Sequence, residues 1–386
     1  MVWNWQRNDW PIFTWHASRL ADREKQFLLG GGILLGAAQH LGKEQQDNLR
    51  VEIMSSEALT TSEVEGEILD RVSLQSSIRR RLGLAADNRR VEAREQGIAE
   101  MMVDVLQTFG TPLTEETLCS WQAMVTNGRR DLADIGQYRT HAEPMQIVSP
   151  RADKHIVYFE APPSAGVPPE MNRFLEWFNG TEKTLPALTR AGIAHLYFET
   201  IHPFEDGNGR VGRAVAQKAL AQGVGQPVIL ALSATVLARR KEYYAALASA
   251  QSGTNDLSDW LTWFTQVGLE AQHCTLALVE FLIGKAQEMD RLRGHLNPRQ
   301  EKALLRMFEA GPDGFAGGMT AKKYISITSA SIATATRDLT DLTEKGALVA
   351  EGTFRDRHYH LRNARWLAPH VTVSKRSKPV EAKESL

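Results

Sequence analysis

The sequence predicts a mainly α-helical protein with one short β-hairpin and a C-terminal winged helix-turn-helix. Apolar residues recur at helical spacing through most of the chain, which indicates helices. One stretch, HIVYFEAPP at 155–163, is rich in strand-forming residues and is closed by two prolines, which favours a short hairpin over a helix. After residue 297, three helical patterns precede two strand-like stretches around a glycine-containing turn, which is the order of a winged helix-turn-helix.

Residues 1–95 are predicted to form an N-terminal helical region. Its first part holds four tryptophans close to Pro11, which predict a segment that packs onto a larger body through aromatic faces: Trp3, Trp5, Trp10 and Trp15. Between Glu44 and Asn88 apolar residues recur at helical spacing, and one of the predicted helices carries the sequence TSEVEGE. Gly83 and the polar residues after it predict a turn.

Residues 96–293 are predicted to form a helical catalytic core. Helical patterns cover 92–109, resume after Thr114, and lead from 186–201 into the sequence HPFEDGNGRVGR. Glycine stops follow the next helix, and more helices are expected to about Arg293.

Residues 294–368 are predicted to form the winged helix-turn-helix. Its helices are expected at 297–309, 320–325 and 329–345, and its two strands within LVAEGTFRDRHYHL. The tail at 369–386 is rich in Lys, Glu, Ser and Pro and is expected to be disordered.

Composition narrows the function classes. The 45 Lys and Arg residues nearly balance the 46 Asp and Glu residues, so the chain as a whole has no electrostatic footprint for nucleic acid or an acidic membrane. The two cysteines, Cys119 and Cys274, lie far apart, which predicts reduced thiols and a cytoplasmic location. The longest apolar run, Phe27 to Ala38, has twelve residues and four glycines, whereas a membrane helix needs about 20 apolar residues. No membrane span or export signal is expected.

The stretch HPFEDGNGRVGR at 202–213 predicts a triphosphate site. Backbone N–H groups of Gly207, Asn208 and Gly209 would converge where a loop turns into a helix, at the positive end of the helix dipole. Arg210 and Arg213, three residues apart, share a face of the first helical turn and could neutralise further phosphate groups.

Two more side chains of this stretch predict the chemistry. Asp206 offers a carboxylate to Mg²⁺, which prefers a few carboxylates together with phosphates. His202 is the side chain best suited near neutral pH to accept a proton from an attacking hydroxyl. One loop would therefore hold the base, the metal ligand and the phosphate clamp.

This stretch resembles the signature of the Fic family, HPFx[DE]GNGRxxR, at every defined position. The resemblance implies a Fic-type helical core that transfers AMP from ATP to a Ser, Thr or Tyr hydroxyl of a target protein. It implies His202 as general base and Asp206 as Mg²⁺ ligand. It also implies Asn208 and its flanking glycines on the α- and β-phosphates, with Arg210 and Arg213 on the β- and γ-phosphates.

A second resemblance lies upstream. TSEVEG matches the family's inhibitory pattern [ST]xxxE[GN], with Thr61, Glu65 and Gly66 at the defined positions. Thr61 and Glu65 are four apart and are expected to share a helix face. The resemblance implies that Glu65 pairs with Arg213 and keeps it from the γ-phosphate. The first 84 residues also resemble the N-terminal region of one bacterial Fic subgroup.

Two further segments resemble substrate-binding parts of the family. The resemblance implies that HIVYFEAPP is a flap whose edge holds the target by strand addition, through Ile156, Val157, Tyr158 and Phe159. The stretch EYYAALASAQ at 242–251 implies an adenine pocket with Tyr243 and Tyr244 as walls and Gln251 as a polar partner.

Several alternatives stay open. The enzyme could remove AMP from a modified protein, or it could transfer another group such as UMP or phosphocholine, because the motif specifies a diphosphate clamp better than a base. Expected partners are the target protein, the enzyme itself through self-modification, and a second copy in a homodimer. In an alternative of another class, the C-terminal module binds DNA and the core senses nucleotide. Its residues 296–362 carry ten Lys or Arg against eight Asp or Glu, so DNA binding is not favoured.

Overall fold

The computed structural model describes residues 2–39, 41–148, 157–312, 314–353 and 356–362. This part of the chain is mainly helical and contains two short antiparallel strand pairs, so the predicted mainly α-helical class is confirmed. The chain divides into two compact units, Met1–Thr275 (unit 1) and Leu276–Leu386 (unit 2), and each is described by itself.

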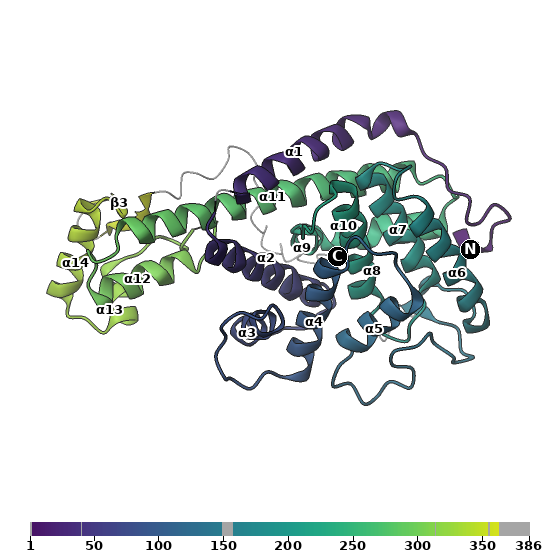
Figure 1. Cartoon of the computed structure of the whole chain (residues 1–386), viewed down its shortest axis with the longest axis horizontal. Coiled ribbons are helices and arrows are strands. Elements are labelled where there is room, and N and C mark those ends of the chain that lie inside the picture. Colours follow the sequence, from purple (N-terminus) through teal and green to yellow (C-terminus); the bar gives the residue numbers. More distant parts are fainter. Residues whose placement is uncertain (1, 40, 149–156, 313, 354–355, 363–386) are drawn as a thin grey trace, which may run out of the picture. The chain divides into compact units, whose positions relative to one another are not determined.

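Two adjacent helices form the centre of unit 1, as Figure 1 shows: α7 (Ala187–Ile201) and α8 (Asn208–Val224). Every residue of α7 is buried, and most of its side chains are apolar, as expected for a helix at the centre of a core. The helices α4 and α5 pack on α8, whereas α6 and α10 pack on α7. The bounds of the remaining core helices are Ala93–Gln107 (α4), Glu115–Val125 (α5), Val167–Gly180 (α6), Leu232–Ala238 (α9) and Arg240–Ser252 (α10). The long helix α11 (Ser258–Arg291) begins in unit 1 and continues into unit 2.

Local sequence signals explain where several of these helices begin. The Thr114 side chain accepts a hydrogen bond from the Thr117 backbone N–H and caps α5, which begins where the helical pattern was expected to resume. Gly97 lets α4 approach α5 closely, because a Cβ there would lie 1.8 Å from the carbonyl oxygen of Met124. The helix α6 was absent from the sequence-based expectation, although its apolar residues recur at helical spacing.

The N-terminal region packs on the core of unit 1 as three helices: α1 (Ala21–Gln39), α2 (Lys43–Val64) and α3 (Arg71–Arg81). The sequence did not predict α1, because its four glycines lower helix propensity. The tertiary contacts explain Gly30, since a Cβ there would lie 2.2 Å from Gln272 Oε1. Gln272 in turn donates a hydrogen bond to the Phe27 carbonyl, at 2.8 Å. Close packing on α11 therefore overrides the local preference.

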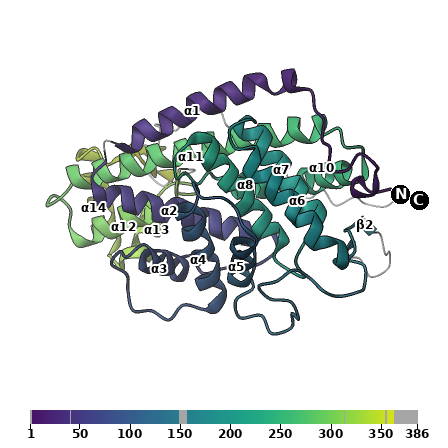
Figure 2. The ribbon, with the colours of Figure 1, turned by 45° about the vertical axis from the view of Figure 1, so that its right-hand side comes forward.

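The predicted hairpin forms from β1 (Gln146–Val148) and β2 (Val157–Glu160), which pair antiparallel with Ile147 opposite Phe159. The start of the chain lies beside β2, as Figure 2 shows. Trp3 packs edge-on against Phe159 with ring centroids 5.4 Å apart, and Trp5 Nε1 donates to the Glu160 carbonyl at 2.7 Å. The N-terminal tryptophans thus pack onto a larger body, as their clustering predicted.

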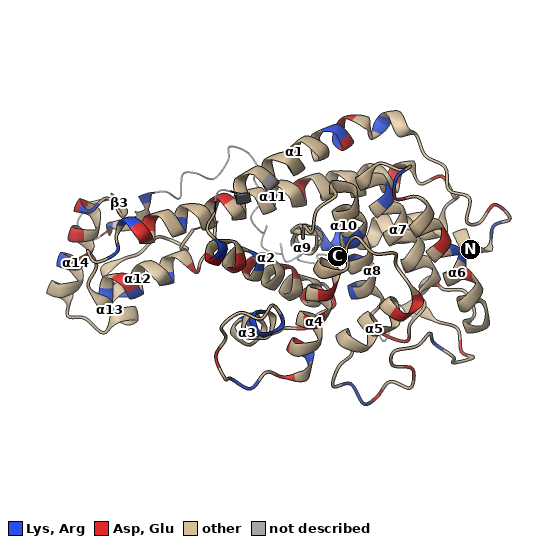
Figure 3. Ribbon diagram, viewed as in Figure 1, with Lys and Arg blue, Asp and Glu red and all other residues tan. Residues whose placement is uncertain are grey.

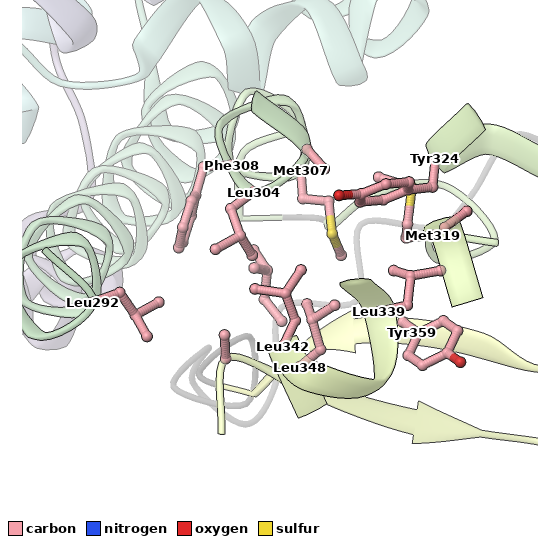
Figure 4. Packing of buried hydrophobic residues seen from close by; sticks show 14 residues of the cluster. Leu292, Leu304, Met307, Phe308, Met319, Tyr324, Leu339, Leu342, Leu348 and Tyr359 are labelled. Atoms are coloured by element: carbon pink, nitrogen blue, oxygen red, sulfur yellow. The ribbon is translucent and has the colours of Figure 1, made fainter. Parts of the chain in front are cut away.

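Unit 2 contains three helices followed by a strand pair, in the order that the sequence predicted. These are α12 (Pro298–Phe308), α13 (Ala321–Thr328), α14 (Ile332–Glu344), β3 (Leu348–Glu351) and β4 (His358–Leu361). Figure 4 shows the hydrophobic core that holds them together, which includes Leu304, Tyr324 and Leu348. Asp338 is buried beneath this core, where it accepts hydrogen bonds from Arg299 and from the Tyr324 hydroxyl. The expected disordered tail lies outside the described residues.

By length and mean hydropathy alone, α11 could cross a membrane. Polar residues interrupt its apolar stretches, so no uninterrupted apolar run in the sequence indicated this helix. Within unit 1, its residues Trp260, Leu261 and Phe264 are buried by protein, as in the core helix of a globular domain.

Candidate active site

The loop between α7 and α8 carries the motif residues. The helix α7 ends at Ile201, and His202 follows as its C-cap with a left-handed backbone conformation, φ 50° and ψ 60°. This conformation is uncommon for a residue with a side chain, and such residues cluster at functional sites. Gly207, with φ 88°, is the N-cap of α8, where glycine carries no steric cost.

His202 lies in a nearly closed environment. Its side chain is only 12% exposed, and its Nδ1 lies 3.8 Å from Glu199 Oε2. Burial, assisted by the positive charge of Arg139, lowers the pKa of His202 to about 4. The imidazole is therefore neutral near pH 7, which is the form that accepts a proton.

Glu199 completes this environment from the last turns of α7. Burial, together with the nearby carboxylate of Glu65, raises the pKa of Glu199 to about 8. The carboxyl is therefore largely protonated near pH 7 and adds little negative charge beside His202. The sequence analysis did not single out Glu199, because a glutamate within an apolar helix has no spacing that marks it.

Asn208 fixes the shape of the loop. Its Oδ1 accepts a hydrogen bond from the Phe204 backbone N–H at 2.9 Å, and its Nδ2 donates to the Phe204 carbonyl at 2.7 Å. Both polar ends of the side chain are thus bound to the loop itself. The predicted contact between Asn208 and the phosphates would therefore be made by its backbone N–H, because both polar atoms of the side chain are occupied.

Asp206, the candidate Mg²⁺ ligand, is already engaged. Its Oδ2 accepts from Arg129 Nη1 at 2.5 Å, and its Oδ1 accepts from the Gly207 backbone N–H at 2.5 Å. Within the described ranges, no group of three or more His, Cys, Asp or Glu side chains is arranged to hold a metal ion. A single carboxylate still fits Mg²⁺ bound to a nucleotide, because that ion takes most of its ligands from phosphates and water. Arg129 would have to withdraw first, and no sequence pattern pointed to it.

Arg213 is buried and is held by the end of α2. Its Nε donates to Thr61 Oγ1 at 2.8 Å and its Nη2 to the Thr61 carbonyl at 2.9 Å. Nη2 also lies 2.8 Å from Glu65 Oε1. Burial opposes the charge of Arg213, but the Glu65 carboxylate raises the pKa of the guanidinium above its usual value. The structure thus brings together Thr61, Glu65 and Arg213.

Glu65 also occupies the space above the start of α8. A Cβ added to Gly209 would lie 2.2 Å from Glu65 Oε1, so a larger residue there would require this carboxylate to shift. The same first turn of α8 was predicted to cradle a phosphate. A carboxylate therefore lies where the sequence predicts an anion.

The end of α2 explains how Glu65 reaches this position. The helix α2 ends at Val64, so Glu65 is its C-cap residue. The expectation that Glu65 lies within the helix, on one face with Thr61, is therefore wrong by one residue. Gly66 adopts φ 87°, its N–H bonds to the Glu63 carbonyl, and the Glu67 N–H bonds to the Ser62 carbonyl. These two bonds form a Schellman motif, in which glycine takes the left-handed position.

Glu67, on the same turn, is a residue that the sequence analysis missed. Its Oε2 lies 2.6 Å from Arg210 Nη1, and Arg210 is 4% exposed. The turn Glu65-Gly66-Glu67 thus pairs with both motif arginines. Its position two residues after Glu65 could have indicated a second contact with the motif, but the family's inhibitory pattern ends at Gly66.

The predicted adenine-pocket residues lie near the site but in different settings. Tyr243 is buried, and its hydroxyl lies 2.9 Å from His195 Nε2. Gln251 is buried and donates to the Glu199 carbonyl at 3.2 Å. Tyr244 is 41% exposed, and its hydroxyl donates to the Val64 carbonyl at the end of α2. Of the three, Tyr244 has the most surface to offer a ligand, and their role stays a prediction.

The predicted flap residues alternate along β2. Phe159 points inward onto Trp3, whereas Tyr158 is 45% exposed and Val157 is partly buried. Ile156 lies outside the described residues. The side chains on the exposed face are thus available to a partner, while the opposite face is fixed by the N-terminal segment.

Two family models match separate parts of the chain. Residues 112–220 match the model described as Fic/DOC family, and residues 3–84 match one described as a domain of unknown function, DUF4172. The first match includes α7, the motif loop and most of α8. The second includes the tryptophans at the hairpin and the turn that holds the two arginines.

Several curated proteins resemble the middle of the chain. The chain is 35% identical over 95 residues to a probable protein adenylyltransferase of Aquifex aeolicus, covering 25% of this chain and 27% of that protein. It is 28% identical over 127 residues to protein adenylyltransferase fic-1 of Caenorhabditis elegans, covering 33% and 22%. The matched part spans about a quarter of the length of these relatives.

Among solved structures, a Fic family protein of Desulfovibrio desulfuricans shares 19% identity and a TM-score of 0.49, over 88% of this chain and 95% of that one. The motif at 202–213 matches the Fic signature in full, and the Fic/DOC model covers it. Residues 112–220 therefore correspond to a Fic/DOC family domain, and the rest of the chain lies outside that match.

Proposed function

We propose that this chain is a protein adenylyltransferase, which moves AMP from ATP onto a Ser, Thr or Tyr hydroxyl of a target protein and of itself. The observation that carries the proposal is the loop before α8, where a neutral His202 stands beside a helix N-terminus with two buried arginines. The names of the relatives from Aquifex aeolicus and Caenorhabditis elegans support the same reaction class.

The reaction would be a displacement at the α-phosphate. The neutral His202 imidazole accepts the proton of the attacking hydroxyl, whose oxygen forms a bond to the α-phosphorus. The bond between that phosphorus and the oxygen bridging to the β-phosphate breaks, and pyrophosphate leaves. Arg210 and Arg213 stabilise the charge that builds on the leaving group. Mg²⁺ bound through Asp206 would neutralise part of the phosphate charge.

We infer further that the chain is autoinhibited. Glu65 lies against Gly209 and Arg213, so its carboxylate competes with a phosphate for the same arginine and the same space. An ATP molecule that lacks the Arg213 contact would be bound without the alignment that in-line attack needs. The position of Glu65 thus supports an inhibited resting state, from which the turn must move before ATP binds productively.

Intact mass of the Glu65→Gly protein after incubation with ATP and Mg²⁺ tests the reaction. We expect a gain equal to one AMP residue, because the turn no longer occupies the phosphate site. Incubation without ATP is the control, and UTP and CDP-choline are run as alternative donors. A gain only with another donor would assign another group, and a loss of AMP from pre-modified protein would favour the reverse reaction.

The DNA-binding alternative concerns unit 2. Figure 3 shows acidic and basic residues intermixed along the helices of this unit. The helix α14 and its C-cap carry three acidic residues, Asp338, Asp341 and Glu344, and two basic ones, Arg337 and Lys345. Asp338 and Asp341 are hydrogen-bonded to residues of α12. A phosphate backbone requires a basic surface, so we propose that unit 2 serves in target docking or dimerisation.

A further inference from the structure

Arg139 is a buried guanidinium that belongs to no motif. Its side chain is 2% exposed, and among the described residues it forms no ion pair. Burial lowers the pKa of Arg139 to about 10. A buried charge without a carboxylate partner is costly, and it is retained only where specific hydrogen bonds compensate.

The hydrogen bonds of Arg139 converge on the end of α7. Its Nε donates to the His202 carbonyl at 2.8 Å, its Nη2 to the Ile201 carbonyl at 3.4 Å, and its backbone N–H to the Pro203 carbonyl at 2.9 Å. The last carbonyls of a helix lack partners within the helix and carry partial negative charge. The guanidinium satisfies two of these carbonyls and the backbone N–H of Arg139 satisfies the third, so one residue binds three successive carbonyls around the left-handed His202.

The remaining donors of Arg139 reach the segment that follows the hairpin. Its Nη2 also donates to the Pro162 carbonyl and its Nη1 to Ser164 Oγ, the latter at 2.9 Å. The Ser164 hydroxyl donates in turn to the His141 carbonyl. One side chain therefore joins the loop that carries the base to the segment next to β2.

We propose that Arg139 is a positioning residue for the transfer reaction, which holds His202 in its left-handed conformation and fixes the base relative to the hairpin. The inference rests on the proposed function of His202. A general base displaced by about 1 Å can lose on the order of 10² in rate, whereas the phosphate clamp on α8 would be untouched. Arg139 therefore affects transfer far more than nucleotide binding.

The charge of Arg139 gives a second readout. The groups that act on His202 are Arg139, which lowers its pKa, and Glu65 and Asp206, which raise it, with Glu199 at 3.8 Å. Removal of the positive charge should raise the pKa of His202 from about 4. The acid limb of the pH profile for transfer should move in the same direction.

Arg190 provides a matched control. It is also buried, its pKa is also lowered to about 10 by burial, and its Nη2 donates to the Phe178 carbonyl at 2.7 Å. It lies on α7 twelve residues before His202, about 18 Å away along the helix axis. A substitution at Arg190 should reduce stability without moving the base.

The experiment compares Arg139→Lys and Arg190→Lys in the Glu65→Gly protein. We expect Arg139→Lys to lower self-labelling from α-labelled ATP at least about tenfold, with ATP affinity within about twofold, and Arg190→Lys to change neither per folded molecule. Equal rates in the two variants would overturn the proposal. If the Glu65→Gly parent itself incorporates no label, the proposed function fails, and Arg139 is judged by the following measurement.

That measurement follows the His202 imidazole resonance by NMR against pH and needs no transfer. In Arg139→Gln the resonance should titrate at a higher pH than in the parent, and in Arg190→Gln at the parent's pH. Identical titrations in both variants would exclude a role for Arg139 at the base. Lys keeps the positive charge of Arg139, and Gln removes it. Both side chains keep N–H donors for the carbonyls, so two independent variants are available if one of them fails to fold.

A separate observation concerns Glu67. We infer that Glu67 is a second internal competitor of the nucleotide, because it holds Arg210 while Glu65 holds Arg213. Both carboxylates project from one Schellman turn onto the two arginines predicted to bind neighbouring phosphates. The turn would therefore act as an internal mimic of a diphosphate, and release of Glu65 alone would leave half of it in place.

Calorimetric titration with ATP tests this inference. Glu67→Gln in the Glu65→Gly protein should tighten ATP binding about threefold to fivefold, since an ion pair whose carboxylate is partly exposed contributes up to about 1 kcal/mol. Glu63→Gln removes the same charge from an exposed position on α2 and should leave the affinity unchanged. Equal affinities with and without Glu67, or an equal gain from Glu63→Gln, would reject the role. A parent that binds no ATP would instead reject the proposed function.

Discussion

Glu65→Gly should raise self-labelling from α-labelled ATP by about 10² to 10³-fold, the range that one well-placed donor to a developing charge contributes. The carboxylate now lies 2.8 Å from Arg213 Nη2 and against Gly209. Its removal frees the guanidinium for the γ-phosphate and empties the space above the first turn of α8. The α-phosphate can then align with the incoming hydroxyl.

Arg213→Ala decides whether Glu65 acts through that arginine. If it does, the double variant should label as weakly as Arg213→Ala alone, because a competitor has no effect once its partner is absent. Wild type and Glu65→Gly complete the four-protein cycle. Additive effects would show that Glu65 acts elsewhere. Unchanged or lower labelling in Glu65→Gly would favour the reverse reaction, in which the carboxylate is needed.

His202→Ala should abolish most of this activity. In the Glu65→Gly protein we expect a loss of about 10² to 10⁴-fold in labelling, because no general base remains to accept the proton of the hydroxyl. ATP affinity should stay close to that of the parent, since the arginines on α8 are unchanged. The two measurements together separate loss of chemistry from loss of binding.

His273→Ala, an exposed histidine on α11, is the matched control and should label like the parent. Labelling of His202→Ala at the parent's rate would remove His202 from the catalytic role. A joint loss of labelling and ATP binding would instead indicate that the substitution disturbs the loop, because His202 has a left-handed backbone conformation.

The sequence alone determined the helical class and most element positions. Helical periodicity and stop residues are local properties, so the helices from α2 to α5 and from α12 to α14 could be predicted from their own residues. The motif between α7 and α8 could be predicted for the same reason. Base, carboxylate, glycines and arginines all lie within twelve neighbouring residues, and a helix N-terminus has the same chemistry in any fold.

Only the tertiary structure decided which distant residues meet there. The sequence suggested Glu65 through a short pattern, but Glu67, Arg129 and Arg139 had no spacing that marked them. Each reaches the motif from a segment more than sixty residues away in the chain. Local patterns carry no information about such contacts, because a charged side chain at the surface and one that binds a buried partner look the same in one dimension.

The same reason explains α1. Its glycines argue against a helix when only local propensity is weighed, at a cost of about 1 kcal/mol each. In the folded protein, Gly30 lets α1 approach the Gln272 side chain on α11 and bury Phe27 completely. Burial of a phenylalanine stabilises by about 1.5 to 3 kcal/mol, which exceeds the cost of Gly30 alone at the point where the two helices meet. Propensity belongs to the sequence, whereas the packing partner is defined only by the fold.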